Sequence, residues 1–579
     1  MLKIIFRELR QYKLTAIMAP IWTSLSVLMS TLIPYVTAFI IDRGISQSNL
    51  QEVYFWGGVM LLMTGLNLIF GIRSAYDAAY SSAGLAANLR SAMYENILKM
   101  SCADVDHFST PSLITRMTTD VVSVQTAFQM LLRISVRAPL NILCALVMCM
   151  MINIRLSLIF VVSSIILVVS LYLIISHCVR IFAELLKKYD ELNAIVRENV
   201  QGMRVVKSFV REKHESAKFR IAVNVLYAMS VRVETLMTLN MPVMELVTYG
   251  SMIALSYLGA RFIVVDGTLT TGQLTSMFSY VMAVLMSLMM LSFIFIQLTM
   301  SWPSLVRIAE VIKEKPDMEE PERPIEQVQD GSVTFSNVGF AYQEGGESIL
   351  KDISFKIAPG ESIGILGATG SGKSTLVSLI PRLYDVKEGS VSVGGKDVRS
   401  YSLDALRRDV VTVLQKTTLV RGSVLENLRW GRSDATLEEC QAACRLAQAD
   451  GFVSEMPEGY QSHIEQNGRN LSGGQKQRLS IARALVAKPK VLILDDALSA
   501  VDTKTEKLIR QSLLLECKDT TLVIISQRIQ SIKDCDRIIV LDDGKIQAVG
   551  THDELLESSS IYHEIYELQT SDGEADFDQ

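Results

Sequence analysis

Six long apolar segments occupy the first 300 residues of this chain, and they constrain its fold more than any other feature. A helix of about 20 apolar residues is long enough to cross the apolar core of a bilayer. The third segment is the weakest of the six, because Arg133 and Arg137 lie at its start. The pattern predicts a bundle of six transmembrane helices. The segments lie near residues 14–41, 55–73, 136–152, 156–175, 241–263 and 274–300.

The composition agrees with a chain that is partly membrane protein and partly soluble domain. Apolar residues make up 49% of the 579 residues, and the mean hydropathy of +0.29 is high for a soluble protein. The net charge of −5 argues against nucleic acid as a partner, because such a partner normally requires a basic surface. The eight cysteines form no Cys-x-x-Cys pair, so the sequence indicates no zinc site.

Basic residues indicate the orientation of the bundle. Residues 1–13 carry basic side chains on one helical side and apolar ones on the other, which is typical of a helix in the membrane interface or of an ordinary surface helix. A second concentration of basic residues lies in the stretch 176–240. Because Lys and Arg concentrate on the cytoplasmic side, we expect the N-terminus and the polar stretches 74–135 and 176–240 to face the cytoplasm. The chain is thus predicted to be a multi-pass protein of the cell (cytoplasmic) membrane.

Changes in composition divide the chain into four parts. Residues 1–308 form the predicted transmembrane domain, with an interfacial N-terminal helix and two long intracellular loops. Residues 309–330 are acidic, contain three prolines and predict a linker or a docking strand. From 331 to 565 strand and helix patterns alternate, which predicts an α/β domain. Residues 566–579 form an acidic tail that we expect to be disordered.

A glycine-rich motif follows the apolar strand predicted at 362–366 and precedes a predicted helix. This order of strand, loop and helix is the context that a P-loop requires. Its glycines let backbone N–H groups approach the phosphates of ATP, and the start of the helix adds positive potential. Lys373 is expected to reach the β- and γ-phosphates, and the Ser374 hydroxyl to bind Mg²⁺. The predicted ATP-binding residues of the loop are Gly367, Ala368, Thr369, Gly370, Ser371, Gly372, Lys373, Ser374 and Thr375.

A second apolar strand, at 491–495, ends in Asp495. Beside a P-loop, such a carboxylate can hold Mg²⁺ directly or through water. The sequence therefore predicts ATP and Mg²⁺ as the cofactors of the second domain.

The pentapeptide LSGGQ at 471–475 identifies this domain more closely. Together with the two motifs above, it makes the domain resemble the nucleotide-binding domain of ABC transporters. The resemblance extends to Tyr342, where family members stack the adenine, to Gln415, which resembles their Mg²⁺-sensing glutamine, and to the loop 499–502. In the family, LSGGQ caps the γ-phosphate of ATP bound to the opposite domain. The corresponding residues here are Ser472, Gly473, Gly474 and Gln475, and the implied Mg²⁺ contacts are Ser374, Gln415 and Asp495.

The membrane half resembles the exporters of the same family. Residues 108–121 and 198–209 look like their two intracellular loops, each with a short coupling helix that contacts a nucleotide-binding domain. Residues 267–274 look like the outer turn before their sixth helix. The resemblance implies a fold of six transmembrane helices followed by an α/β P-loop domain. It also implies a half-transporter that works as a dimer, because each ATP is held between two domains.

Two residues depart from the family pattern. Asp496 occupies the position of the general base, which is normally Glu, and Gln527 occupies the position of a His that contacts the γ-phosphate. Asp is one methylene shorter than Glu, and Gln cannot become cationic. Both changes fall in the catalytic site built on this chain's own P-loop, whereas LSGGQ, which serves the other site, is complete. We therefore expect the degenerate-site half of a bacterial heterodimer, with hydrolysis mainly at the site of a non-identical partner.

The resemblance implies ATP-driven export of hydrophobic or amphipathic compounds, that is, drug efflux. Two alternatives stay open: an exporter of lipid or peptide, and a regulatory half-transporter whose ATP is mainly structural. The fifth and sixth apolar segments are rich in Met, which suits adaptable ligand binding and equally suits simple apolar lining. Glu245 lies within the fifth segment and either attracts cationic compounds or pairs with Arg133 or Arg137.

Overall fold

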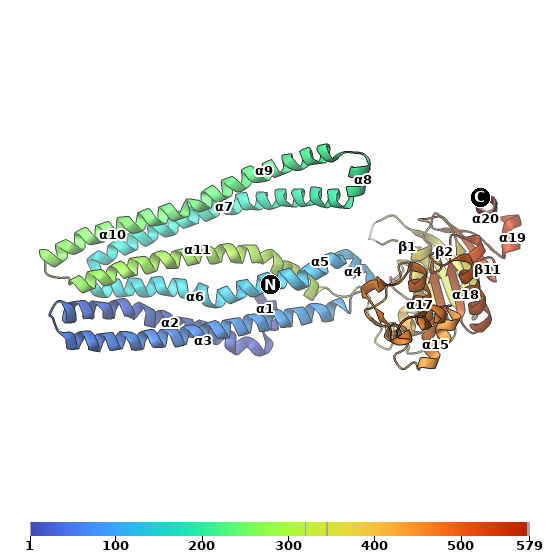
Figure 1. Cartoon of the computed structure of the whole chain (residues 1–579), viewed down its shortest axis with the longest axis horizontal. Helices are drawn as coiled ribbons and strands as arrows, with labels where there is room; N and C mark the ends of the chain where they lie inside the picture. Colours follow the sequence, from blue (N-terminus) through green and yellow to red (C-terminus); the bar gives the residue numbers. More distant parts are fainter. Residues whose placement is uncertain (1, 319, 343–345, 576–579) are drawn as a thin grey trace. The chain divides into compact units, whose positions relative to one another are not determined.

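The computed structural model of this chain describes residues 2–318, 320–342 and 346–575 (Figure 1). The chain divides into two compact units. The membrane unit comprises Met1–Leu98 and Thr110–Glu314, and the sheet unit comprises Lys99–Ser109 and Lys315–Gln579. The short segment Lys99–Ser109 therefore belongs to the sheet unit, although the chain on both sides of it belongs to the membrane unit.

Among the described residues, six helical segments of the membrane unit are long and apolar enough to cross a membrane, which confirms the predicted bundle. Helices α3 and α7 have 48 residues each, so each spans about 70 Å, more than twice the apolar thickness of a bilayer. They therefore extend well beyond the membrane. The principal helices are α2 (Lys13–Phe39), α3 (Leu50–Ile97), α6 (Val121–Ile152), α7 (Ile154–Gln201), α10 (Asn240–Val264) and α11 (Thr271–Lys313).

Helices α7 and α9 (Glu212–Thr238) lie side by side and diverge from the other helices of the membrane unit (Figure 1). The short helix α8 (Met203–Ser208) joins α7 to α9 at the tip. We call α7, α8 and α9 the arm. Large apolar side chains are exposed at and beside the tip, which indicates a surface that another element covers. They belong to Met203, Val205, Phe209 and Val210.

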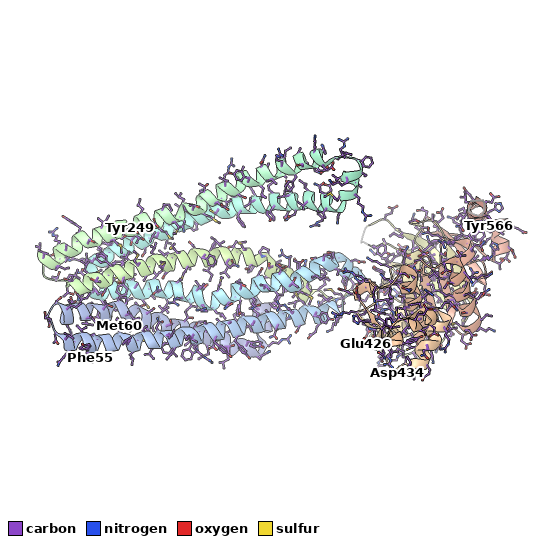
Figure 2. The ribbon with its side chains drawn as sticks, viewed as in Figure 1. Phe55, Met60, Tyr249, Glu426, Asp434 and Tyr566 are labelled. Carbon is purple, nitrogen blue, oxygen red and sulfur yellow. The ribbon has the colours of Figure 1, made fainter. Side chains whose placement is uncertain are left out.

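Polar side chains bridge the packed helices of the membrane unit. Asn141 Nδ2 on α6 donates to Ser287 Oγ on α11 at 2.8 Å. Such bridges are typical of membrane bundles, because hydrocarbon offers a polar group no other partner. On the outside, large apolar side chains such as Phe55 on α3 and Tyr249 on α10 are exposed, as expected for a surface that lipid covers (Figure 2).

The sheet unit is built on a six-stranded sheet with the order β12-β11-β3-β10-β9-β6. All neighbouring strands in it are parallel except β11 and β12. β3, β9 and β10 are buried along their whole length, which explains their continuous apolar sequences. The strands are β3 (Ser362–Leu366), β6 (Val410–Val413), β9 (Val491–Asp495), β10 (Thr521–Ile525), β11 (Arg537–Asp542) and β12 (Lys545–Gly550).

A smaller antiparallel sheet and a group of helices complete this unit. The order of the smaller sheet is β2-β1-β4-β5. Helices α14, α15 and α17 share one hydrophobic core with β9 and β10. The predicted α/β architecture after the bundle is thus confirmed. These strands and helices are β1 (Val333–Phe340), β2 (Leu350–Ile357), β4 (Glu388–Val393), β5 (Lys396–Asp397), α14 (Val424–Arg429), α15 (Leu437–Leu446) and α17 (Gly473–Val486).

The segment at 309–330, predicted to be a linker or a docking strand, begins as a helix and later pairs with the sheet unit. Helix α11 continues to Lys313, so its first residues are helical. Further along, Ile325 forms a β-bridge with Tyr401, and Ile325 N donates to Ser400 O at 2.9 Å. These contacts favour a docking strand over a free linker.

The C-terminal segment is helical further than the sequence predicted. Helix α20 spans Ser560–Ala575, so the expected disordered tail is instead helical as far as Ala575. Residues 576–579 lie outside the described residues.

Candidate nucleotide-binding site

The carboxyl ends of parallel strands bring the predicted nucleotide residues to one edge of the sheet. β3 leads into the P-loop, β9 into Asp496, β10 into Gln527 and β6 into Gln415. Because parallel strands end at the same edge, residues distant in sequence line one cavity of about 340 Å³. Its lining residues are Ile349, Thr369, Gly370, Gly372, Lys373, Ser374, Thr375, Gln415, Asp495, Asp496, Ile525, Ser526 and Gln527.

The P-loop holds Lys373 against its own backbone. Lys373 Nζ donates to the carbonyl oxygens of Gly367 at 2.8 Å and Ala368 at 2.6 Å. Burial lowers the pKa of the Lys373 ammonium. Gly372, just before helix α12 (Lys373–Ser378), has a φ of +98°, which L side chains rarely adopt. The loop therefore depends on glycine to place an ammonium group in the lining of the cavity.

Asp495 is a buried carboxylate beside the P-loop. It is 6% exposed and accepts a hydrogen bond from Ser374 Oγ at 2.9 Å. Burial raises the pKa of Asp495, and the hydrogen bond from Ser374 opposes that rise. Among the described residues, no three His, Cys, Asp or Glu side chains form a metal-binding group. A hydroxyl and a carboxylate nevertheless suit Mg²⁺, which usually completes its shell with phosphate oxygens and water.

Asp496 contacts both Gln415 and the strand β10. Gln415 Nε2 donates to Asp496 Oδ2 at 3.3 Å. Asp496 N donates to Ile525 O at 3.1 Å, and its φ of +48° lies in the left-handed region, where Asp is enriched among non-glycine residues. The backbone at Asp496 is thereby fixed to the neighbouring strand, and its short side chain is drawn toward Gln415.

The C-terminal helix holds the loop that carries Gln527. Gln569 on α20 donates from Nε2 to Gln527 O at 2.7 Å. Its Oε1 accepts from Ile529 N at 2.9 Å. One amide therefore brackets this loop. Sequence patterns do not reveal Gln569, because a single glutamine on a terminal helix belongs to no motif.

The LSGGQ residues lie apart from this cavity. None of the described residues that line it belongs to the pentapeptide. Ser472 caps α17: its Oγ accepts from Gln475 N at 3.3 Å, and Gln475 Oε1 accepts from Ser472 N at 2.9 Å. Gln477 on the same helix accepts from Ala500 N at 2.9 Å, which ties α17 to the loop after Asp496. LSGGQ, which we call the signature loop, and the P-loop are thus two separate surfaces of one unit.

Tyr342 contacts the P-loop from another side. Its Oη lies 3.0 Å from Thr375 Oγ1, and Tyr342 as a whole is 47% exposed, so part of it is accessible to a nucleotide base. Two further aromatic rings meet it edge-on: the centroid of Phe340 lies 5.0 Å away and that of Tyr384 lies 5.1 Å away. The sequence does not indicate that Tyr384 contacts Tyr342, because the two residues lie far apart along the chain.

Known proteins share both units of this chain. Residues 17–289 match the family of ABC transporter transmembrane regions, and residues 350–499 match the family described as ABC transporter. The chain is 35% identical over 562 residues to the uncharacterized ABC transporter ATP-binding protein YfiB of Bacillus subtilis, with 97% of each chain covered. It is 31% identical over 566 residues to the putative multidrug export ATP-binding/permease protein YgaD of the same species, again with 97% of each covered.

A lipid flippase and a solved exporter are also similar. The chain is 29% identical over 543 residues to the ATP-dependent lipid A-core flippase of Haemophilus influenzae, covering 93% of this chain and 92% of the flippase. A bacterial Atm1-family ABC exporter with ATP bound matches with a TM-score of 0.77 and 25% identity, covering 97% of this chain and 99% of the other. The chain belongs to the ABC transporter family. It is a multi-pass membrane protein with an ATP-binding domain and has the fold of an exporter half-transporter, which typically works with a partner half.

Proposed function

We propose that this chain is the degenerate-site half of a heterodimeric ABC exporter that uses ATP to export hydrophobic or amphipathic compounds. It would lie in the cytoplasmic membrane, with its N-terminus and ATP-binding domain in the cytoplasm. A second, non-identical half-transporter would supply the site that performs most of the hydrolysis.

One observation carries this assignment. Asp496 and Gln527 line the same cavity as Lys373, whereas Ser472 and its neighbours in LSGGQ lie outside it. Both departures therefore affect one ATP site, and the complete signature loop is free to serve the other. A chain that worked only with copies of itself would carry the same weakness at both sites.

The geometry at Asp496 explains why hydrolysis would be slow. A general base must come within about 3 Å of the water that it orients, and such a base contributes about 10²–10⁴ in rate. The short Asp496 side chain accepts from Gln415 at 3.3 Å, while its backbone is fixed to β10. Gln527 can donate a hydrogen bond to a phosphate but cannot supply a positive charge.

The remaining site residues would hold ATP and Mg²⁺. We assign the phosphates to the P-loop and Lys373, the adenine to Tyr342, and Mg²⁺ to Ser374, Gln415 and Asp495. Ser472 and the two glycines that follow it would donate to the γ-phosphate of the ATP that the partner holds. The chemistry of these donor groups supports the assignment, because they combine a cation, backbone N–H groups and carboxylates within one cavity.

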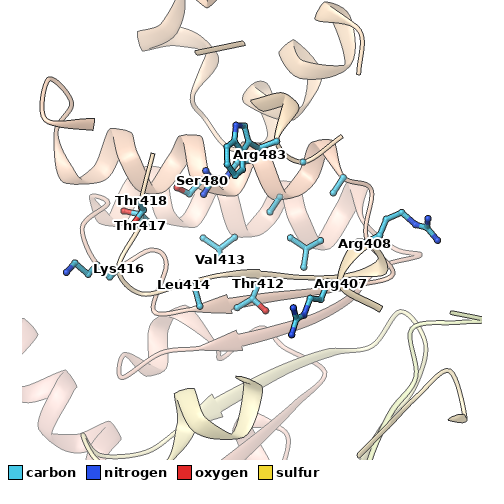
Figure 3. Close-up of a pocket in the computed structure, with 15 residues that line it drawn as sticks. Arg407, Arg408, Thr412, Val413, Leu414, Lys416, Thr417, Thr418, Ser480 and Arg483 are labelled. Carbon is cyan, nitrogen blue, oxygen red and sulfur yellow. The ribbon is translucent and has the colours of Figure 1, made fainter. Parts of the chain in front are cut away.

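A groove beside the glutamine loop suits a coupling helix of the partner half. It lies between β6 and α17, has a volume of about 290 Å³ and contains the labelled residues Thr412, Val413, Ser480 and Arg483 (Figure 3). Trp430, which also lines the groove, is 67% exposed. Apolar side chains are also exposed at the tip of the arm of each half, so we propose that the arm of one half reaches the groove of the other.

Two relatives point to the substrate class. One is named as a putative multidrug exporter and another as a lipid A-core flippase, and both kinds of compound are at least partly apolar. Within the described part of the chain, Glu245 forms no ion pair with Arg133 or Arg137, and its side chain is exposed. An exposed carboxylate in the fifth membrane segment favours attraction of cationic compounds over the structural pair.

The ATPase activity of purified protein tests the heterodimer directly. Assemblies of this chain alone should hydrolyse ATP slowly, and Asp496→Glu combined with Gln527→His should raise the rate about 10- to 100-fold, because the pair restores the general base and the cation. Asp434→Asn, at an exposed position of the same unit, is the matched control. Hydrolysis by the unaltered chain alone at ordinary exporter rates would overturn the assignment.

A regulatory half-transporter predicts a different result. If ATP at this site were only structural, Lys373→Ala would leave transport by an assembled pair almost unchanged. The proposed exporter half predicts a several-fold loss, because ATP at this site closes the dimer in every cycle. Transport of a fluorescent dye into inverted vesicles measures the difference.

A further inference from the structure

A series of contacts joins the P-loop to the short helix Cys102–Phe108 through a tyrosine that belongs to no motif. Thr375 Oγ1, at the end of the P-loop, lies 3.0 Å from Tyr342 Oη. The rings of Tyr342 and Tyr384 meet edge-on, with centroids 5.1 Å apart and an interplanar angle of 85°. Tyr384 Oη then donates to Asp106 Oδ2 at 2.7 Å. Asp106 lies on α4 (Cys102–Phe108), and all four residues belong to the sheet unit.

The turn that carries Tyr384 is fixed to the rest of the sheet unit. Arg407 donates from Nη2 to the carbonyl oxygen of Arg382 at 2.7 Å. Arg382 is 3% exposed and donates to both carboxylate oxygens of Asp385, at 2.7 and 2.9 Å. Because close-packed groups cannot move independently, a shift of the Tyr342 ring is passed to Tyr384 rather than absorbed.

Helix α4 is attached to this unit at its start as well. Asp104 Oδ2 accepts from Ser101 N at 2.9 Å, which caps the helix, and from Asp317 N at 3.4 Å. The chain enters α4 from α3, which ends at Ile97, and leaves it into α5 (Thr110–Thr115). A displacement of α4 therefore acts on two helices of the membrane unit through the backbone itself.

We propose that Tyr384 is a positioning residue that transmits the occupancy of the ATP site to α4. A base stacked on Tyr342 fixes that ring, the edge-to-face contact fixes Tyr384, and the hydrogen bond to Asp106 extends the restraint to α4. Only ATP binding is needed for this relay. It therefore stands whether or not this chain's own site hydrolyses ATP, and it goes beyond the assignment of the two ATP sites.

The full-length chain in lipid nanodiscs tests the relay with two measurements. The first is the Kd of a fluorescent ATP analogue, and the second is hydrogen exchange of residues 99–109 with and without ATP. Tyr384→Phe keeps the ring contact and removes the hydrogen bond to Asp106. We expect its Kd to stay within about twofold, while the ATP-dependent protection of 99–109 falls at least about threefold, since a net hydrogen bond of this kind is worth roughly that factor or more. Tyr384→Ala also removes the ring contact and should raise the Kd about two- to tenfold.

A matched control exists in the same unit. Tyr460 Oη donates to Asp450 Oδ1 at 2.6 Å, so Tyr460→Phe removes the same kind of hydrogen bond at a place that lines neither the cavity nor α4. It should leave the ATP response of 99–109 intact, and Asp106→Asn, which keeps an acceptor oxygen, should retain most of that response.

Three results would overturn the relay. The first is an unaltered chain whose exchange at 99–109 does not respond to ATP. The second is a Tyr384→Phe variant that responds as fully as Tyr460→Phe. The third is a Tyr384→Phe variant whose exchange rises equally with and without ATP, which would mean that Tyr384 only stabilises the helix.

Discussion

The P-loop cavity and helix α17, which begins within LSGGQ, belong to the same folded unit, but only α17 keeps every residue of the family pattern. The cavity combines an intact P-loop with Asp496 and Gln527, the two residues that depart from the family pattern. The start of α17 keeps every signature residue, with Ser472 and Gln475 in a capping box. In a dimer of this family each surface serves a different ATP. One chain can therefore depart from the pattern at one site and keep it at the other, and this difference is the basis of the proposed asymmetric pair.

The largest expected effect concerns the signature surface. Ser472→Ala should lower ATP hydrolysis by the assembled pair about 10²-fold, because removal of one donor to transition-state charge typically costs that factor. Thr436→Ala is the control, since Thr436 caps α15 in the same way, with its Oγ1 accepting from Glu439 N at 3.3 Å. Steady-state ATPase measurements compare the two variants. Equal losses would show that Ser472 only stabilises a helix and would remove the asymmetry.

The next effect concerns the metal side of the P-loop cavity. The pKa of Asp495 is raised by burial, so this carboxylate takes up a proton at a higher pH than an exposed Asp, whose pKa is about 3.9. Mg²⁺ requires the ionised form. We therefore expect the Mg²⁺-dependent affinity for ATP to fall as the pH is lowered from 7 to 5, approaching about tenfold per pH unit once the pH lies below the pKa of Asp495.

The folding stability of the protein depends on pH in the opposite direction. Because the folded-state pKa of Asp495 is raised, its neutral form favours folding, and the protein without Mg²⁺ should gain stability as the pH falls toward the ordinary range of Asp. Asp495→Asn should remove both dependences, whereas the exposed control Asp434→Asn should keep them. Thermal unfolding and titration of a fluorescent ATP analogue between pH 5 and 7 measure them, and identical pH profiles for the two variants would contradict the role given to Asp495.

A smaller effect is expected at Gln569, whose side chain holds the loop that carries Gln527. Gln569→Ala removes both hydrogen bonds that bracket this loop, and the ATP analogue should dissociate about two- to fivefold faster, since a net hydrogen bond contributes about 1 kcal/mol. Gln448→Ala is the control, because Gln448 is also an exposed amide that donates to a backbone carbonyl, that of Arg445, at 3.2 Å. Stopped-flow displacement measures the rate. An unchanged rate would mean that the cavity does not depend on the C-terminal helix.

The smallest effect concerns the membrane unit. Glu245→Gln should reduce transport of a cationic dye about two- to threefold and leave a neutral dye unaffected, because only the cation is attracted by the charge that the substitution removes. Glu234→Gln, at an exposed position of α9, is the control. Equal loss for both dyes would show that Glu245 supports the bundle instead.

The sequence by itself determined the parts of this protein whose signal is local. Six apolar segments predicted six membrane helices, because the length of a span follows from the thickness of a bilayer. The P-loop, Asp495 and LSGGQ could be located because each requires fixed residue types at fixed spacing beside a strand or a helix. The sequence placed the ends of two helices less accurately: α11 runs past residue 309, and α20 continues into the expected tail.

Only the tertiary structure decided which of these parts meet. Parallel strands place Gln415 against Asp496 and leave LSGGQ outside the cavity, and neither result follows from spacing along the chain. The contacts of Tyr384 with Asp106 and of Gln569 with the loop at Gln527 join residues from separate elements. Such contacts are set by the order and packing of the strands and helices, which is why no local pattern in the sequence revealed them.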